Sequence, residues 1–271
     1  MNIGMQGVQG WKHGKNIMGL DIPEALDDTI CLPEKHPMAW FNQVMGGDGL
    51  TPSQVLLFTG DAGIGKSTTL LQLADAFQGK GTCKNSGKKV IVIYNTNEES
   101  LYQVRRVIRR LGLKCGFIAG QDRMLSALIA HVDEVQKKNP DARVIVIQDS
   151  LQTLDDGHYA DGGITSGTNM RCMEAIVKHA KEQWSTWIVI GQVTKGGEAS
   201  GKNSLIHAAD AHLRFRFDTS KKSVTHGERL MHTTKNRFGS AGITYVMGMS
   251  ASGVFSKGAY TDIIDGTAGE E

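Results

Sequence analysis

The stretch VLLFTGDAGIGKSTTLLQLADAFQ, residues 55–78, decides the fold of this 271-residue chain. It opens with a short apolar run, VLLFTG (55–60), and closes with STTLLQLADAFQ (67–78), whose apolar residues recur at helical spacing. Residues 60–67, between these two parts, fit the pattern GxxxxGK[ST]. A strand, a glycine-rich loop and a helix in this order form a phosphate-binding loop, whereas a chance glycine turn lacks that context. The stretch therefore predicts a nucleotide site.

The residues of this loop have separate expected roles. Its glycines let consecutive backbone N–H groups and the helix N-terminus point at phosphate. Lys66 is expected to reach the β- and γ-phosphates, and the Ser67 hydroxyl to bind Mg²⁺. We therefore expect ATP and Mg²⁺ as cofactors. The full set of expected nucleotide contacts is Gly60, Asp61, Ala62, Gly63, Ile64, Gly65, Lys66, Ser67 and Thr68.

Apolar runs alternate with helical stretches on the C-terminal side of the loop. KVIVIYN (89–95), RVIVIQDS (143–150) and WIVIGQV (187–193) are separated by segments with helical periodicity. Continuous Val/Ile runs of this kind are typical of a parallel sheet with helices on both faces. After Ala211 no further helices are expected, and alternating runs such as LRFRF predict antiparallel strands. We predict an α/β fold with a mostly parallel central sheet and C-terminal antiparallel strands.

The composition indicates a globular chain without strong bulk charge. Thirty Lys and Arg against 28 Asp and Glu leave a net charge of +2, so nucleic-acid contacts have to come from local loops. No apolar stretch approaches the ~18–20 residues of a membrane span, and the N-terminus lacks the apolar run of a signal peptide. The four cysteines form no close pair, which argues against a zinc ribbon and a disulfide framework. We expect a cytoplasmic protein, with a glycine-rich lead-in arm at 1–34 and one domain at 35–271.

Two acidic residues follow buried runs at the predicted edge of the sheet. Asp149 ends RVIVIQD, where a carboxylate can hold Mg²⁺ through water; the alternative is an Asp that caps the following turn. Glu98 follows the KVIVIYN run and is the favoured general base, which would orient the attacking water. Glu99 is another candidate, although Thr96 and Glu99 have the spacing of a capping box, and the third alternative is that neither glutamate is the base.

The motifs together resemble the ATPase core of the RadA (Sms) DNA repair family, a branch of the RecA superfamily that is related to the DnaB helicases. The resemblance covers about residues 35–256 and rests on DAGIGKSTTLLQLA, YNTNEES, IQDSLQTL, GQVTKGGEASGKNSLIHAAD and TTKNRFGSAGITYVM. KNRFG, from Lys235 to Gly239, is its most specific mark. The family's four-cysteine zinc finger and Lon-protease-like domain are not found in this sequence. Ala62, Asn97 and Gln192 replace residues that are usual in the family.

The resemblance implies a RecA-like fold in which the nucleotide lies between the subunits of a hexameric ring or a helical filament. Lys235 and Arg237 would then reach the phosphates bound by the neighbouring subunit, with Arg237 as an arginine finger. Gln192 resembles the γ-phosphate sensor of RecA. Two alternatives stay open for the basic pair: a solvated strand end, or contact with DNA phosphate.

Two glycine-rich loops fit contact with single-stranded DNA, because tracking a backbone needs Lys, N–H groups and hydroxyls but little sequence reading. One is DDGHYADGGITSGTN (155–169), with Tyr159 as a single stacking candidate, and the other spans Thr194 to Ser204. Plain surface loops are the alternative. The expected DNA contacts are Thr194, Lys195, Gly196, Gly197 and Lys202.

Four arginines, Arg105, Arg106, Arg109 and Arg110, recur at i,i+4 spacing after Glu98. A basic stripe of this kind can bind nucleic acid, but the pattern by itself favours a solvated amphipathic face.

These observations lead to the hypothesis of a RadA-like, DNA-dependent ATPase that moves on single-stranded DNA as a homo-oligomer during recombination or repair. A recombinase or a replication protein is a further candidate partner. Two alternatives stay open. A DnaB-type replicative helicase motor shares every motif, and a nucleotide-switched scaffold would bind ATP with little turnover. Retention of Glu98 and Arg237 counts against the scaffold, because a pure switch needs neither.

Overall fold

The computed structural model describes residues 27–192 and 200–264, which form one sheet of eleven strands with helices on both faces. Five parallel strands make its centre, in the order β4, β6, β7, β2 and β8. This confirms the expected α/β fold with a mostly parallel central sheet. The bounds are Lys89–Thr96 for β4, Ala142–Asp149 for β6, Thr186–Gln192 for β7, Val55–Gly60 for β2 and Ala211–Phe217 for β8.

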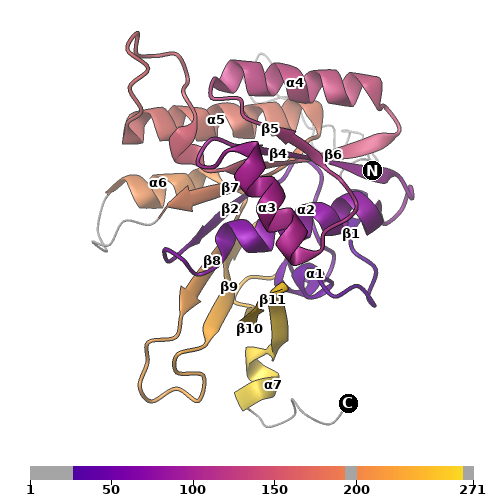
Figure 1. Cartoon of the computed structure of the whole chain (residues 1–271), viewed down its shortest axis with the longest axis vertical. Helices are drawn as coiled ribbons and strands as arrows, with labels where there is room; N and C mark the ends of the chain where they lie inside the picture. Colours follow the sequence, from indigo (N-terminus) through magenta and orange to yellow (C-terminus); the bar gives the residue numbers. More distant parts are fainter. Residues whose placement is uncertain (1–26, 193–199, 265–271) are drawn as a thin grey trace, which may run out of the picture.

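Antiparallel strands extend both edges of this centre. β9 (Arg229–Asn236), β10 (Thr244–Ser250) and β11 (Gly253–Ala259) follow β8 in that order, as the alternating C-terminal runs predict. In Figure 1 they reach away from the parallel strands toward the C-terminus. At the other edge, β1 (Ile30–Cys31) pairs with β3 (Thr82–Cys83), and β3 with β4. The short β5 (Ile118–Gly120) runs parallel to the end of β4.

The parallel strands separate two hydrophobic cores. Leu56 and Phe58 of β2 point into one, and Val55 and Leu57 into the other, because successive side chains of a strand face opposite sides. The helices that close the first core are α1 (Trp40–Val44), α2 (Lys66–Lys80) and α3 (Leu101–Leu111). Those that close the second are α4 (Leu125–Lys138), α5 (Ser166–Gln183) and α6 (Ser200–Ala208) (Figure 1). A short 3₁₀ turn, η3 (Leu151–Thr153), follows β6.

Three local features differ from the expectations. A short helix, α7 (Tyr260–Ile264), follows β11 where no helix is predicted, because five residues are too few to show a periodic pattern. α6 begins at Ser200, inside the stretch that reads as a flexible loop. The capping box of α3 consists of Ser100 and Gln103, so the assignment of that box to Thr96 and Glu99 is wrong. Thr96 still belongs to β4, which places the helix start one turn later.

The N-terminal part of the described chain joins the same fold. Ile30 of β1 and Leu32 are buried in the core that also holds Phe41. Residues 1–26 lie outside the described residues, and the division at residue 34 between an arm and a domain remains a prediction. In the two described ranges, no helix combines the length and apolar character that crossing a bilayer requires.

A buried histidine lies on the strand next to the one that leads into the loop. His212 of β8 has its Nε2 2.7 Å from the Thr59 hydroxyl and its Nδ1 2.5 Å from the Thr234 hydroxyl. Burial lowers the pKa of His212 to about 4, and the positive charges of Arg214, His232 and Lys235 act in the same direction. The imidazole is therefore neutral in the folded protein near pH 7.

This histidine should make stability depend on pH. In the unfolded chain it takes up a proton near its ordinary pKa, whereas the folded protein resists protonation until about pH 4. As pH falls through that window, the free energy of unfolding should drop by up to ~1.4 kcal/mol per pH unit from this residue alone. Urea unfolding at about pH 7 and about pH 5 measures the slope of the free energy of unfolding against pH. His212→Gln should make this slope smaller.

The exposed His226→Gln is the matched control and should keep the wild-type slope. Equal slopes for wild type and His212→Gln would contradict the assignment.

Candidate nucleotide-binding site

The glycine-rich loop leaves the first turn of α2 open to an anion. The N-cap of α2 is Gly65, whose φ of 113° favours glycine, and no side chain caps the helix. The first N–H groups of a helix have no partner within it, and their partial positive charge attracts phosphate. Lys66, Ser67 and Thr68 of this first turn line a pocket of about 480 Å³.

Two glycines of the loop are required for different reasons. A β-carbon at Gly60 would lie 2.2 Å from the carbonyl oxygen of Phe215 in β8, so the backbone of the neighbouring strand excludes a side chain there. A β-carbon at Gly65 would meet only the flexible end of Met249 in β10, and it is the φ of 113° that favours glycine at this position.

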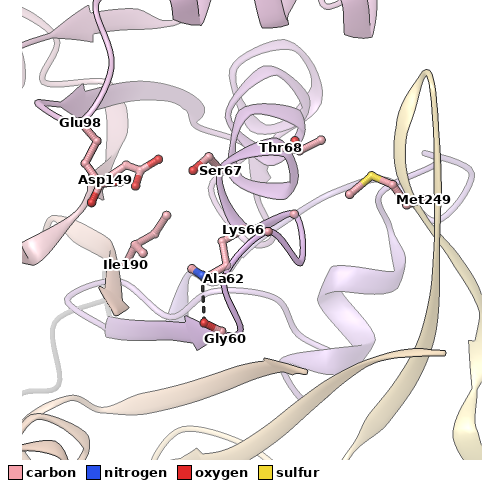
Figure 2. A pocket seen from close by; sticks show the side chains of 11 residues that line it. Gly60, Ala62, Lys66, Ser67, Thr68, Glu98, Asp149, Ile190 and Met249 are labelled. Atoms are coloured by element: carbon pink, nitrogen blue, oxygen red, sulfur yellow. Dashed lines mark hydrogen bonds between the residues drawn. The ribbon is translucent and has the colours of Figure 1, made fainter. Parts of the chain in front are cut away.

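Figure 2 shows how the pocket side chains face one another. Glu98 and Asp149 approach from the ends of β4 and β6, and Ser67 lies across from them on α2. Met249 closes the opposite side. The complete lining is Gly60, Ala62, Gly63, Gly65, Lys66, Ser67, Thr68, Glu98, Asp149, Ile190 and Met249.

The Lys66 ammonium folds back onto its own loop. It donates hydrogen bonds to the carbonyl oxygens of Gly60 and Asp61, each at 2.9 Å. Figure 2 shows the bond to Gly60. Burial lowers the pKa of Lys66, and the negative charges of Asp149, Asp61 and Glu98 oppose that shift. A bound phosphate would replace the two carbonyls as partner, since it offers the ammonium a full negative charge.

Asp149 is a buried carboxylate with defined partners. The Tyr94 hydroxyl donates to its Oδ2 at 2.7 Å, and Ser67 lies across from it in the pocket. Burial raises the pKa of Asp149, and the hydroxyls of Tyr94 and Ser67 together with the Lys66 charge partly offset the rise. The side chain thus faces the pocket and Ser67, and not the turn that the alternative interpretation had it cap.

A hydrogen bond from Ser150, the residue after Asp149, holds Glu98 beside Asp149. The hydroxyl of Ser150 donates to the Glu98 Oε1, and Glu98 itself is exposed to the pocket. Glu99 is absent from the pocket lining. The sequence predicts neither Ser150 nor Tyr94 as a site residue. The register of β4 and β6 could have indicated Tyr94: it pairs Thr96 with Asp149, and Tyr94 lies two residues before Thr96, on the same face of β4.

The donor set fits Mg²⁺. The Ser67 hydroxyl and the Asp149 carboxylate are hard oxygen donors that face the same space, and a hydrated magnesium ion needs only one or two such protein ligands beside phosphate oxygens. No group of three or more His, Cys, Asp or Glu side chains converges on a metal position in the part of the chain that the structure describes. The donors therefore suit a metal that arrives with a phosphate ligand.

Lys235 and Arg237 lie outside this pocket. The Lys235 ammonium donates to three carbonyl oxygens at the C-terminal end of α6, those of Ile206, His207 and Ala209, at 2.7–3.0 Å. The Arg237 guanidinium is 3.0 Å from the carboxylate of the buried Asp210, and about half of its side chain is exposed. Their action on a neighbouring subunit remains a prediction.

The remaining predicted residues fall at or beyond the end of β7. The backbone of Gln192 pairs in register with Gly60, which places it beside the start of the loop. Residues 194–197, with the expected DNA contacts Thr194, Lys195, Gly196 and Gly197, lie outside the described residues. Lys202 belongs to α6, and its side chain is likewise outside the description.

Comparisons with known proteins bear on this site. The AAA domain family matches residues 51–192, about half of the chain. The DNA repair protein RadA of Rickettsia conorii is 34% identical over 221 residues, which is 80% of this chain and 45% of that protein. RadA of Pseudomonas aeruginosa is 32% identical over 217 residues, 79% of this chain and 43% of the relative. RadA of Mycobacterium tuberculosis is 33% identical over 207 residues, which is 74% of this chain and 38% of the relative.

The resemblance to the RadA core is thus confirmed, and the chain spans less than half the length of these curated relatives. A solved structure of a KaiC-like protein from the archaeon Pyrococcus horikoshii superposes with a TM-score of 0.58 at 15% identity. It covers 80% of this chain and 94% of that one. At this identity the likeness shows the fold alone, and it confirms the expected RecA-like core.

The raised pKa of Asp149 leads to a prediction with two readouts. Its charge disfavours the folded state above the ordinary carboxyl pKa, so Asp149→Asn should leave the free energy of unfolding without nucleotide equal to or above that of wild type. The same change should lower magnesium-dependent nucleoside triphosphate hydrolysis by about 10- to 100-fold, because the metal loses an anionic partner. Urea unfolding and steady-state hydrolysis measure the two effects. A variant that unfolds more easily than wild type would contradict the electrostatic argument.

Proposed function

Because the chain belongs to the AAA domain family and is a P-loop ATPase whose core is related to RadA, we propose that it hydrolyses ATP with Mg²⁺ to move on single-stranded DNA in recombination or repair. It acts in the cytoplasm as a homo-oligomer, a hexameric ring or a helical filament, with ATP bound between subunits. The observation that carries the proposal is the single pocket that collects the phosphate loop, Glu98 and Asp149.

The chain's own residues divide the chemistry among them. The N–H groups of the loop and of the first turn of α2 bind the phosphates, and Lys66 moves from its two carbonyl partners to them. Ser67 and Asp149 would hold Mg²⁺, which neutralises phosphate charge when it is bound. Glu98 accepts a proton from the attacking water, and the Ser150 hydroxyl fixes the orientation of its carboxylate.

Lys235 and Arg237 act at the nucleotide that the neighbouring subunit binds. Arg237 is half exposed, so its guanidinium can reach beyond the subunit while Asp210 orients it. Lys235 and Arg237 both contact the end of α6, which follows directly on the stretch with the expected DNA contacts. DNA binding at residues 194–197 would therefore act through α6 on the two residues that reach the adjacent site.

The expected DNA loop at residues 155–169 lacks the lysines of the stretch from Thr194 to Ser204. Residues 154–165, the loop that leads into α5 in Figure 1, contain three Asp and no Lys or Arg. Arg171 forms an ion pair with Asp156 of this loop and lies over the Tyr159 ring, 5.6 Å from its centroid. Contacts of this loop with DNA would be made by backbone N–H groups and by Tyr159.

The direct test is steady-state ATP hydrolysis with and without single-stranded DNA, with Lys66→Ala as the blank. We expect DNA to raise the wild-type rate several-fold. Glu98→Gln should lower turnover by about 10²- to 10⁴-fold, because the amide keeps the shape of the side chain but cannot take a proton. Glu99→Gln is the matched control and should keep wild-type turnover.

If ATP binds and wild-type turnover stays at the blank level with or without DNA, the protein is a nucleotide-switched scaffold instead. If turnover is intact and forked duplex DNA is unwound, the replicative helicase motor is the better description.

A mixing experiment tests whether Arg237 acts between subunits. Arg237→Ala alone should lose about 10³- to 10⁵-fold in rate while it still binds ATP. Lys66→Ala subunits carry an intact Arg237, so an equal mixture should regain activity at roughly a quarter of its sites, where an intact loop meets an intact finger across a head-to-tail contact. A mixture that stays as inactive as its components would show that Arg237 acts within its own subunit.

A further inference from the structure

One face of α3 carries four arginines and a tyrosine and no acidic residue. Tyr102, Arg105, Arg106, Arg109 and Arg110, called here the arginine face, are all exposed. Val104 and Leu111 on the opposite side are buried, and Val107 and Ile108 pack against the same core. The helix is thus fixed by its apolar side, and the arginine face points to solvent.

The arginines of this face have almost no partners. Arg110 donates to the carbonyl oxygen of Ala251 at 3.2 Å, but Arg105, Arg106 and Arg109 make no side-chain hydrogen bond or ion pair within residues 27–192 and 200–264. Arg105 and Arg109, and likewise Arg106 and Arg110, are like charges at i,i+4, a spacing that disfavours the helix. Arg109 and Arg110 lie in the last turn, where the helix dipole favours cations, but no such term acts on Arg105 and Arg106, and both i,i+4 pairs repel.

Other exposed helices of the protein arrange their charges differently. Lys138 and Glu134 of α4 form an i,i+4 ion pair at 2.6 Å, and Lys178 and Glu182 of α5 form another at 4.0 Å. Such alternation of sign is what solvated helices usually show. α3 departs from it, which indicates an anionic partner that is absent from the isolated chain.

The exposed ring of Tyr102 indicates which kind of anionic partner the arginine face binds. It is 89% exposed and lies one turn before Arg106, on the same face. An exposed aromatic ring beside guanidinium groups suits a single-stranded nucleic acid, whose bases stack on the ring while Arg binds the phosphates. An acidic protein surface would use the arginines and leave the ring in water.

A basic surface of this kind fits the proposed function for two reasons, the charge of the loop before α5 and the position of α3 beside the nucleotide pocket. The described glycine-rich loop before α5 has three Asp and no Lys or Arg, so charge that neutralises phosphate has to come from other residues. α3 begins three residues after Glu98, at the end of β4 that borders the nucleotide pocket.

We propose that the arginine face of α3 is a binding surface for single-stranded DNA, in addition to the two glycine-rich loops. Arg105, Arg106 and Arg109 bind backbone phosphates, and Tyr102 stacks on a base. The inference rests on the proposed function only for the class of ligand, since binding to this face needs neither ATP turnover nor the residues of the pocket.

The test is fluorescence anisotropy with a labelled oligodeoxythymidine of about 20 nucleotides, longer than most single-strand sites, over a range of salt concentrations. The variant is Arg105→Gln, Arg106→Gln, Arg109→Gln. Three lost contacts should reduce the slope of log affinity against log salt by about 2, at ~0.7 per phosphate, with at least a tenfold loss of affinity at low salt. Tyr102→Ala should lower affinity by about 5- to 150-fold and keep the slope.

The matched control is Lys137→Gln, Lys178→Gln, Lys181→Gln, which removes the same charge from exposed positions of α4 and α5 and should keep the wild-type slope. Basal ATP hydrolysis should be unchanged in both triple variants, which shows that they fold. An arginine variant that binds DNA as the control does overturns the proposal and leaves the proposed function standing.

Two further results would also overturn it. If the arginine variant keeps its DNA affinity but loses oligomers in sedimentation velocity, the face contacts a second copy of the chain. If the wild-type protein hydrolyses ATP and binds no DNA, the DNA-dependent function fails together with this surface.

Discussion

The uncapped N-terminus of α2, held at the carboxyl end of β2, is the feature on which the rest of this structure depends. A helix that begins on Gly65 leaves its first N–H groups without side-chain partners, and these groups line a pocket. They stay there because β2 is central in the sheet, with β7 and β8 on either side and a hydrophobic core on each face. The Asp61 N–H donates to the carbonyl oxygen of Phe215, which ties the start of the loop to β8. The anion site is therefore built on rigid elements.

Two acidic side chains, Glu98 and Asp149, lie near this positive helix end, and the Asp149 charge does not stabilise the fold. Burial raises the pKa of Asp149, so the ionised side chain opposes folding. The hydrogen bond from Tyr94 and the nearby Ser67 hydroxyl offset only part of that effect, and the Ser150 hydroxyl holds Glu98 beside Asp149. A metal ion that arrives with a nucleotide would supply the missing positive charge. The same reasoning applies to α3, whose like-charged arginines disfavour the isolated helix and become favourable with a polyanion.

The wrong predictions concern places where two neighbouring segments fit the same local pattern or where a helix begins inside a loop-like sequence. The spacing of Thr96 and Glu99 fits a capping box, but Ser100 and Gln103, each four residues later, fit equally well and form it. The choice depended on how far β4 extends, and pairing with β6 keeps Thr96 in the strand. The stretch from Thr194 to Ser204 read as one flexible loop because Gly and Ser dominate it, yet its last residues begin α6. Both errors concern the ends of elements, where tertiary pairing outweighs local propensity.

By itself, the sequence determined the phosphate loop, the parallel centre of the sheet and the positions of Glu98 and Asp149 at strand ends, because each depends on a pattern within one short segment. Only the tertiary structure decided which other side chains complete the pocket. Met249 and Ile190 come from strands far along the chain, and Tyr94 reaches Asp149 through the register of β4 and β6. The structure also decided that Lys235 and Arg237 contact the end of α6, away from the pocket of their own subunit. No local pattern encodes these contacts, because they depend on the order in which strands lie beside one another.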